Sequence, residues 1–220
     1  MSLYYLLSPN SYLLDTSKVI VLLLACLAGC ATRPPPEVDR CLFDGRSLGD
    51  WRPSDFGSGQ GEVTIRNGML VLHQGNDLTG VTWTGPLVRM NYEISLEAQR
   101  VTGEDFFCGL TFPVGPQHCS LIVGGWSGYL TGLSCLDGFD GANNITTTAI
   151  AFENQRWYTI RLRVTPHEVQ VWIDGVETIV IDPSEYYLSV RHEVESSRPL
   201  GIATWCTTGA LRDIRLRKIP

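Results

Sequence analysis

The stretch 106–133 reads FFCGLTFPVGPQHCSLIVGGWSGYLTGL, two alternating segments joined by a Pro/Gly turn. Successive side chains of a strand point to opposite sides of its sheet, so the pattern sorts the residues onto two faces. One face is apolar and is predicted to face a core; it contains Phe106, Cys108, Leu110, Phe112, Cys119, Leu121 and Val123. The other face mixes glycines with polar and aromatic residues; it contains Phe107, Gly109, Thr111, His118, Ser120, Ile122, Gly124 and Trp126. We expect this second face to be open and partly aromatic, as a sugar-sized ligand requires.

Similar segments continue on both sides of this stretch. An Asn67-Gly68 turn between two apolar runs predicts a hairpin, and 92–99 alternates as a half-buried antiparallel strand does. Further strands are predicted at 157–164, 169–173, 176–181, 200–205 and 211–216, whereas the polar segment 182–198 suits a short helix or a lid. About a dozen short strands separated by turns predict an all-β protein, a jelly-roll β-sandwich of two antiparallel sheets.

The composition indicates a globular domain and argues against a nucleic-acid partner and a structural zinc site. The chain has 220 residues, 44% of them hydrophobic and 18% charged, which is typical of a globular domain. With a net charge of −6 and no basic run, we predict no nucleic-acid partner. No CxxC pair is present, which argues against a structural zinc site. Cys108 and Cys119 fall on core faces of adjacent predicted strands, where they form either a disulfide or two small buried hydrophobes.

The N-terminal segment indicates export. An apolar run of 11 residues, 19–29, follows Lys18 and ends in Leu27-Ala28-Gly29-Cys30, which resembles a bacterial lipobox. We therefore predict a lipoprotein signal peptide over 1–30, a lipid on Cys30, a Pro-rich linker over 31–40 and the jelly-roll domain over 41–220. This arrangement would hold the domain at the bacterial cell envelope, with the membrane as a partner through the lipid. The alternative interpretation is an ordinary short hydrophobic helix.

Four motifs in order resemble the 3-keto-disaccharide hydrolase family. They are CLFDGRSLGDWR (41–52), NYEISLEAQR (91–100), RWYTIRLRVTPHEVQVWIDG (156–175) and ALRDIRLRKI (210–219). The resemblance implies a concanavalin A-like jelly roll that acts on carbohydrate as a glycoside-cleaving enzyme. Many members carry acidic groups on a central strand, but the corresponding stretch here, HCSLIVGGWSG (118–128), has no carboxylate. His118, Ser120 and Trp126 are the residues that stand in their place.

Catalysis on a keto-sugar would need few groups. A carbonyl at position 3 acidifies the neighbouring proton, so elimination requires one base and one group that polarises the carbonyl. His118 suits the base because its unperturbed pKa lies near neutrality, and Asp105 or Asp137 would orient it. The alternative for His118 is a partly buried polar residue in a turn.

Aromatic and amide side chains supply the candidate binding residues. Trp126 is the first candidate for stacking on a sugar ring, and Ser120, Phe107, Asn143 and Trp157 are further candidates. The turn-rich loop 135–144 offers oxygen atoms on Asp137, Asp140, Asn143 and Asn144, so a divalent metal such as calcium is a possible cofactor, although an ordinary loop is the favoured interpretation. Two functions remain open: an enzyme acting on an oligosaccharide, and a lectin-like module that binds a glycan without chemistry.

Overall fold

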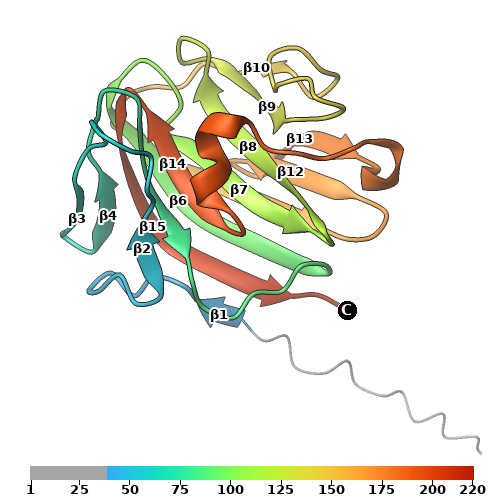
Figure 1. The fold of residues 1–220 in the computed structure, drawn as a ribbon, viewed down its shortest axis with the longest axis horizontal. Coiled ribbons are helices and arrows are strands. Elements are labelled where there is room, and N and C mark those ends of the chain that lie inside the picture. The colour runs from blue at the N-terminus through green and yellow to red at the C-terminus, as the bar shows by residue number, and fades with distance from the viewer. Residues whose placement is uncertain (1–38) are drawn as a thin grey trace, which may run out of the picture. The chain divides into compact units, whose positions relative to one another are not determined.

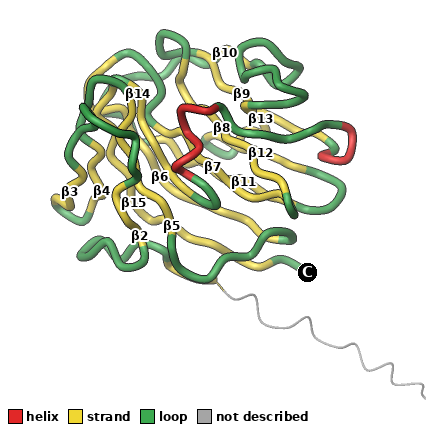
Figure 2. The backbone as a smooth tube through the Cα atoms, in the orientation of Figure 1, coloured by secondary structure: helices red, strands yellow, loops and turns green. Residues whose placement is uncertain are grey.

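A computed structural model describes residues 39–220, and it shows the predicted sandwich of two antiparallel sheets (Figures 1 and 2). Sheet A contains, in spatial order, β13 (Val176–Ile181), β12 (Val169–Ile173), β11 (Tyr158–Val164), β6 (Tyr92–Gly103), β15 (Thr207–Lys218), β4 (Met69–Leu72) and β3 (Val63–Arg66), with β1 (Asp39–Cys41) also paired to β15. Sheet B contains β10 (Thr148–Ala149), β9 (Leu130–Ser134), β8 (Gln117–Gly125), β7 (Cys108–Val114), β14 (Gly201–Trp205), β5 (Leu78–Trp83) and β2 (Trp51–Pro53). The fold is a jelly-roll β-sandwich.

The alternating pattern explains how the two sheets meet. In β6, Tyr92, Ile94, Leu96 and Ala98 are at most 2% exposed and point between the sheets. The Tyr92 hydroxyl donates a hydrogen bond of 2.6 Å to the carbonyl of Pro113, which joins sheet A to sheet B through the core. Trp51, the first residue of β2, is fully buried, and its indole N–H donates to the carbonyl of Leu42 at 2.9 Å.

The hairpin between β3 and β4 follows from two residues. Asn67 and Gly68 have φ angles of 51° and 78°, both in the left-handed region. Two consecutive residues of this kind match the right-handed twist of the flanking strands, which is why Asn-Gly is preferred in two-residue hairpin turns. The predicted turn is confirmed.

Of the two alternatives for Cys108 and Cys119, the structure shows two small buried hydrophobes and no disulfide between them. The β7–β8 register places Cys108 opposite Val123 and Cys119 opposite Phe112, so the two thiols lie at different points along the strands. Both cysteines are free and fully buried, and so they serve as small apolar residues. Burial raises the pKa of the Cys108 thiol to about 12 and also raises that of Cys119.

The predicted positions of Phe106 and Phe107 are exchanged. Strand β7 begins only at Cys108, and the chain bends at Phe107, so the alternation does not extend back to these two residues. Phe107 is fully buried in the core, where its ring lies 5.3 Å from that of Phe152. Phe106 lies on the outer face of sheet B instead.

The segment 182–198 contains two short 3-10 helices, η1 (Pro183–Glu185) and η2 (His192–Ser197). η2 packs against β5 and β14 and lies in front of sheet B in Figure 1. Its Val194 joins a small apolar cluster outside the sandwich, which we call the outer cluster and which contains Leu78, Phe106, Ile122, Val194 and Ala203. The predicted lid therefore covers part of the outer face of sheet B.

The outer face of sheet A carries a charge network centred on Glu93. This carboxylate is 8% exposed in its side chain and accepts hydrogen bonds from Arg161, Arg163 and Arg217 at 3.5, 3.0 and 2.9 Å. The Arg161 guanidinium also lies 3.8 Å from the ring of Trp172. One buried acid thus joins three strands, β6, β11 and β15.

Strand β1 begins at Asp39, two positions before the expected start of the domain at 41, because residues 39–41 pair with the end of β15. The predicted signal peptide, the lipid on Cys30 and most of the linker lie outside the described residues. Within 39–220, no helix has the length and hydropathy that a membrane span requires.

Candidate functional site

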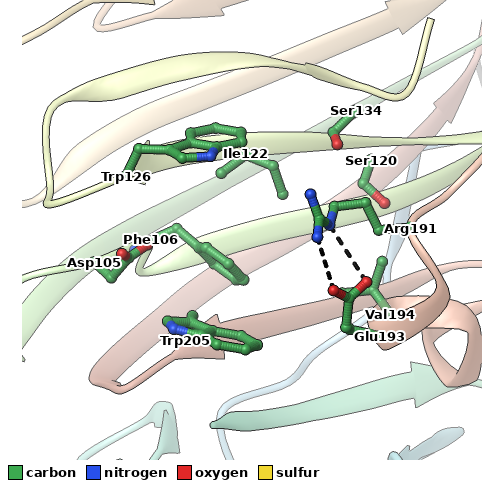
Figure 3. A pocket seen from close by; sticks show the side chains of 10 residues that line it. All are labelled: Asp105, Phe106, Ser120, Ile122, Trp126, Ser134, Arg191, Glu193, Val194 and Trp205. Atoms are coloured by element: carbon green, nitrogen blue, oxygen red, sulfur yellow. Dashed lines mark hydrogen bonds and ion pairs between the residues drawn. The ribbon is translucent and has the colours of Figure 1, made fainter. Parts of the chain in front are cut away.

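A cleft of about 220 Å³ lies on the outer face of sheet B (Figure 3). It is lined by Asp105, Phe106, Ser120, Ile122, Trp126, Ser134, Arg191, Glu193, Val194 and Trp205. Strands β8, β9 and β14 form the floor, the segment 105–106 and the residue after β8 form one end, and η2 with the residue before it forms the other.

Strand register builds the polar part of the floor. Thr111, Ser120 and Ser134 are direct cross-strand neighbours on β7, β8 and β9. The Ser120 and Thr111 hydroxyls lie 2.8 Å apart and share a hydrogen bond, and both serine side chains are 1% exposed. The floor therefore presents hydroxyl groups that are held in place by the sheet itself.

The glycines of this face are more crowded than we expected from the sequence. A Cβ atom on Gly109 would come within 2.8 Å of the Phe106 ring, and one on Gly132 would collide with the carbonyl of Gly141. One on Gly201 would come within 2.8 Å of the Ser197 Cβ. Neighbouring segments thus fill the space over these glycines, and the expected open face is reduced to the cleft at its centre.

Aromatic side chains form the walls nearest Asp105. Phe106, Trp126 and Trp205 line the cleft, and Figure 3 shows their rings around one end of it. Trp126 begins a left-handed run, with φ angles of 50°, 66° and 97° at residues 126, 127 and 128. This backbone turn directs the indole over the floor after β8 has ended. Flat apolar rings next to hydroxyl groups suit a sugar, which has both apolar faces and polar edges.

The turn that carries Trp126 is fastened from two sides. The Asp105 carboxylate accepts the backbone N–H groups of Phe106 and Ser127 at 2.7 and 3.3 Å. Arg100, which is 6% exposed, donates to the carbonyls of Gly128 and Phe152 at 3.2 and 2.7 Å. Asp105 and Trp126 are therefore held together at one end of the cleft.

Arg191 and Glu193 form the opposite end. The Arg191 guanidinium donates to both oxygens of Glu193, at 2.8 and 3.3 Å, and to Asp140 at 3.0 Å. The hydrogen bond between them lowers the pKa of Glu193 and raises that of Arg191, so both groups are charged at neutral pH. Because Asp140 belongs to the loop 135–144, this ion pair also ties that loop to the segment before η2.

Three of the predicted site residues come together in the cleft: Asp105, Ser120 and Trp126. His118 does not join them, although it lies on the same face of β8. Its Nε2 atom lies 3.0 Å from a guanidinium nitrogen of Arg89, and burial together with Arg89 and Arg198 lowers its pKa. Burial and the two arginines disfavour the charged imidazolium, and His118 does not line the cleft, so its role as the catalytic base stays a prediction that this cleft does not support.

Asp137 and Asn143 have structural partners. Asp137 accepts the backbone N–H of Tyr187 at 2.7 Å, and Asn143 donates to Asp140 at 2.7 Å. Both residues are exposed and neither lines the cleft. Asp137 therefore joins the loop 135–144 to the segment before η2. Asn143 donates to Asp140, which accepts a hydrogen bond from Arg191.

Trp157 and Phe107 also lie away from the cleft. Trp157 precedes β11 in sheet A, where the Arg212 guanidinium lies 4.0 Å from its ring. Phe107 is buried in the core, because the chain bends there before β7 begins. Neither can contact a ligand in the cleft.

Sequence reasoning missed Phe106, Ser134, Arg191, Glu193 and Val194. Trp205 occupies an outward position of β14, in keeping with the alternation of that strand. The polarity of 182–198 was a usable signal, since a polar segment predicted as a lid is a natural source of charged residues for the site beneath it. Among residues 39–220, no three His, Cys, Asp or Glu side chains gather as metal ligands.

The two antiparallel sheets and the cleft on the outer face of one of them define a jelly-roll β-sandwich protein. A structure from work on endo-acting O-glycanases of the human gut microbiota is similar over 82% of this chain and 100% of that one, with 13% identity and a TM-score of 0.58. The carbohydrate-binding module CBM66 from Bacillus subtilis is similar over 75% and 93%, with 13% identity and a TM-score of 0.50. A Bacillus subtilis protein with a galectin-like fold is similar over 82% and 97%, with 13% identity and a TM-score of 0.55.

Identities this low show the fold alone, and no curated protein matches the chain. The family is shown by a sequence model. The chain belongs to the family described as the 3-keto-alpha-glucoside-1,2-lyase-like domain, whose model matches residues 39–217. The family resemblance of the four motifs is thereby confirmed.

Proposed function

We propose that the cleft binds a glycoside and, when the sugar carries a ketone at position 3, cleaves it by elimination. The observation that carries this proposal is the arrangement of the cleft: aromatic walls, the Asp105 carboxylate at one end and the Arg191 guanidinium at the other (Figure 3). Membership in a family described as lyase-like supports this type of reaction.

The reaction would use one base and one cation. Asp105 removes the proton on C2, which the neighbouring ketone acidifies, and Arg191 stabilises the negative charge that develops on the ketone oxygen. The electron pair then forms the C1–C2 double bond while the ketone is restored and the glycosidic C1–O bond breaks. The leaving oxygen takes up a proton, and addition of water to the enone gives the free keto-sugar. Hydrolysis is then the sum of elimination and hydration.

Deuterium labelling tests this mechanism. In D₂O, elimination followed by hydration should leave deuterium at C2 of the product of a 3-keto-disaccharide, measured by NMR against a sample without enzyme. Asp105→Asn should reduce turnover by about 10²–10⁴-fold, as loss of a general base does. The matched control is Glu62→Gln, which removes an exposed carboxylate that does not line the cleft. Turnover without enzyme-dependent label at C2 would refute elimination.

A second candidate is a glycan-binding module without catalysis, and Glu193 favours it. Hydrolysis of an ordinary glycoside uses two carboxyl groups, one of them protonated as the general acid. Both oxygens of Glu193 accept hydrogen bonds from Arg191, which keeps this group ionised. The cleft therefore offers Asp105 alone as a proton-transfer group of the usual kind.

Calorimetry with matched tryptophan variants separates the two candidates. Trp126→Ala should abolish glycan binding, whereas Trp157→Ala should not, because Trp157 lies on the other sheet. Glycan binding that depends on Trp126, with no turnover of any 3-keto-glycoside, would establish the binding module and exclude the enzyme.

The site of action is a further part of this proposal. The lipobox-like sequence ending at Cys30 supports a lipid-anchored protein of the bacterial cell envelope. Expressing the full chain with a radiolabelled fatty acid should label the protein, and Cys30→Ser should lose the label. Label retained by Cys30→Ser, or a soluble wild-type protein, would contradict the anchor.

A further inference from the structure

The cleft is continuous with two further hollows, one at each end. The first, which we call the Gln74 hollow, measures about 490 Å³; it is lined by Gln74, Gly103, Glu104, Asp105, Ser127, Trp205 and Cys206. The second, which we call the Ser189 hollow, measures about 360 Å³; it is lined by Cys135, Gly138, Asp140, Ser189, Val190, Arg191, His192 and Glu193. The cleft shares Asp105 and Trp205 with the Gln74 hollow, and Arg191 and Glu193 with the Ser189 hollow.

The two shared pairs lie at opposite ends of the cleft. Figure 3 shows Asp105 and Trp205 at one end, and Arg191 and Glu193 at the other. The three hollows therefore lie in a row with the aromatic cleft in the middle, and we call this row the groove.

We propose that this groove binds a linear glycan chain, with one sugar unit in the cleft and at least one further unit in each end hollow. The inference rests on the proposed function and extends it, because a disaccharide would leave one end of the groove empty. The end hollows suit such a chain: amide, hydroxyl, imidazole and carboxylate groups line them, and these bind sugar hydroxyls at the edges of a ring.

The charge of the groove restricts the kind of chain. Four carboxylates line it, those of Glu104, Asp105, Asp140 and Glu193, against the single guanidinium of Arg191. Arg191 is already bound to two of these carboxylates. An acidic polysaccharide would meet an excess of negative charge, so the chain is neutral or carries amino groups.

The linkage is restricted by the proposed reaction. The central unit must carry its ketone at position 3, so the chain cannot run through the oxygen at that position. A 1,4-linked chain leaves position 3 free, and it is also extended enough to enter at one end of an open groove and leave at the other.

Binding of a size series tests the inference. We would measure calorimetric Kd values for 1,4-linked glucose oligomers of two to six units, in both the α and the β series, on wild type, Gln74→Ala and His192→Ala. The control ligands would be 1,4-linked galacturonic acid oligomers of the same lengths. The two substituted residues are exposed and each lines only an end hollow, so the variants should fold as wild type does.

We expect the Kd of the neutral series to fall by about tenfold on going from two units to four, which corresponds to about 1.4 kcal/mol, and then to level off. Each end variant should lose part of this gain, because it removes a contact with one of the outer sugar units. A disaccharide that binds as tightly as the hexamer, with binding that still requires Trp126, would overturn the groove and leave the proposed function standing. Absence of binding by every oligomer, or preferred binding of the acidic series, would also overturn the groove, whereas the proposed function stands or falls with the 3-keto-disaccharide assay.

Discussion

Replacing Glu93 by glutamine removes one negative charge from among three guanidinium groups while the shape of the side chain is kept. Glu93 is 8% exposed in its side chain, and Arg161, Arg163 and Arg217 lie within 3.5 Å of its oxygens. Glu97, on the same strand and facing the same side, is the matched control. It accepts a hydrogen bond of 2.7 Å from Arg212 alone, and its side chain is 32% exposed.

The size of the effect follows from burial. Removing one partner of a fully buried ion pair costs about 3–5 kcal/mol, because the remaining charge has no compensation. The three arginines around Glu93 are 33–35% exposed in their side chains and can partly regain water, so we expect a smaller cost than for a fully buried pair, about 2–3 kcal/mol, for Glu93→Gln. Glu97→Gln changes an exposed pair and should cost about 0–1 kcal/mol.

Urea unfolding followed by tryptophan fluorescence measures both free energies of unfolding. The protein would be a domain expressed from residue 39 onward, since residues 39–220 contain both sheets. The corresponding fall in Tm is about 4–12 °C for Glu93→Gln, at roughly 2–4 °C per kcal/mol for a domain of this size. Equal effects of the two variants would refute the argument, because burial would then not decide the contribution of the charge.

Three further predictions concern burial and titration. Phe107→Ala should destabilise the domain by about 3–5 kcal/mol in the same urea assay, because the Phe107 ring fills the core. The control Phe139→Ala changes a residue that is 60% exposed, so it should alter the free energy of unfolding by less than about 0.5 kcal/mol. A larger effect of Phe139→Ala than of Phe107→Ala would contradict the assigned positions. Burial and Arg89 lower the pKa of His118 below 6.5 in the folded protein, so the unfolded chain binds the proton first and stability should be lost as pH falls below about 6.5. His118→Asn should therefore reduce the fall of Tm with falling pH. An unchanged dependence of Tm on pH would contradict the environment assigned to His118. Iodoacetamide at pH 8 should alkylate the exposed Cys41 in the native protein and leave the buried Cys108 unmodified until urea is added. Mass spectrometry of the peptides measures both modifications. Rapid modification of Cys108 in the native protein would contradict its burial in the core.

The sequence predicts those parts of this protein that depend on local periodicity. The alternation of 92–99 and 157–164 and the Asn67-Gly68 turn are local signals, and the strands and the hairpin form where they predict. The same reasoning fails at Phe106 and Phe107, because alternation holds only inside a strand and the start of β7 is not encoded by the alternation itself.

The cleft depends on contacts between distant segments, which no local pattern reveals. Ser120 and Trp126 could be named in advance because they lie on the outer face of one predicted strand and just beyond its end. Arg191 comes from a segment about 70 residues further along the chain, and only the packing of η2 on sheet B brings it to Ser120. His118 has the right face and the right chemistry, but Arg89 decides its environment, and that pairing could not be read from spacing.

The protein has two apolar regions, and they support different parts of the structure. The main core lies between the sheets and holds residues such as Trp51 and Phe107, whereas the outer cluster of Leu78, Phe106, Ile122, Val194 and Ala203 lies beyond sheet B and supports the groove. Because the sheet separates them, η2 can be exchanged for another sequence without repacking the main core, whereas the loop 135–144 must keep Leu136, which belongs to that core. The domain is therefore a suitable scaffold for grafting: new glycan specificities can be introduced by replacing η2 and the exposed part of the loop while the stability of the sandwich is retained.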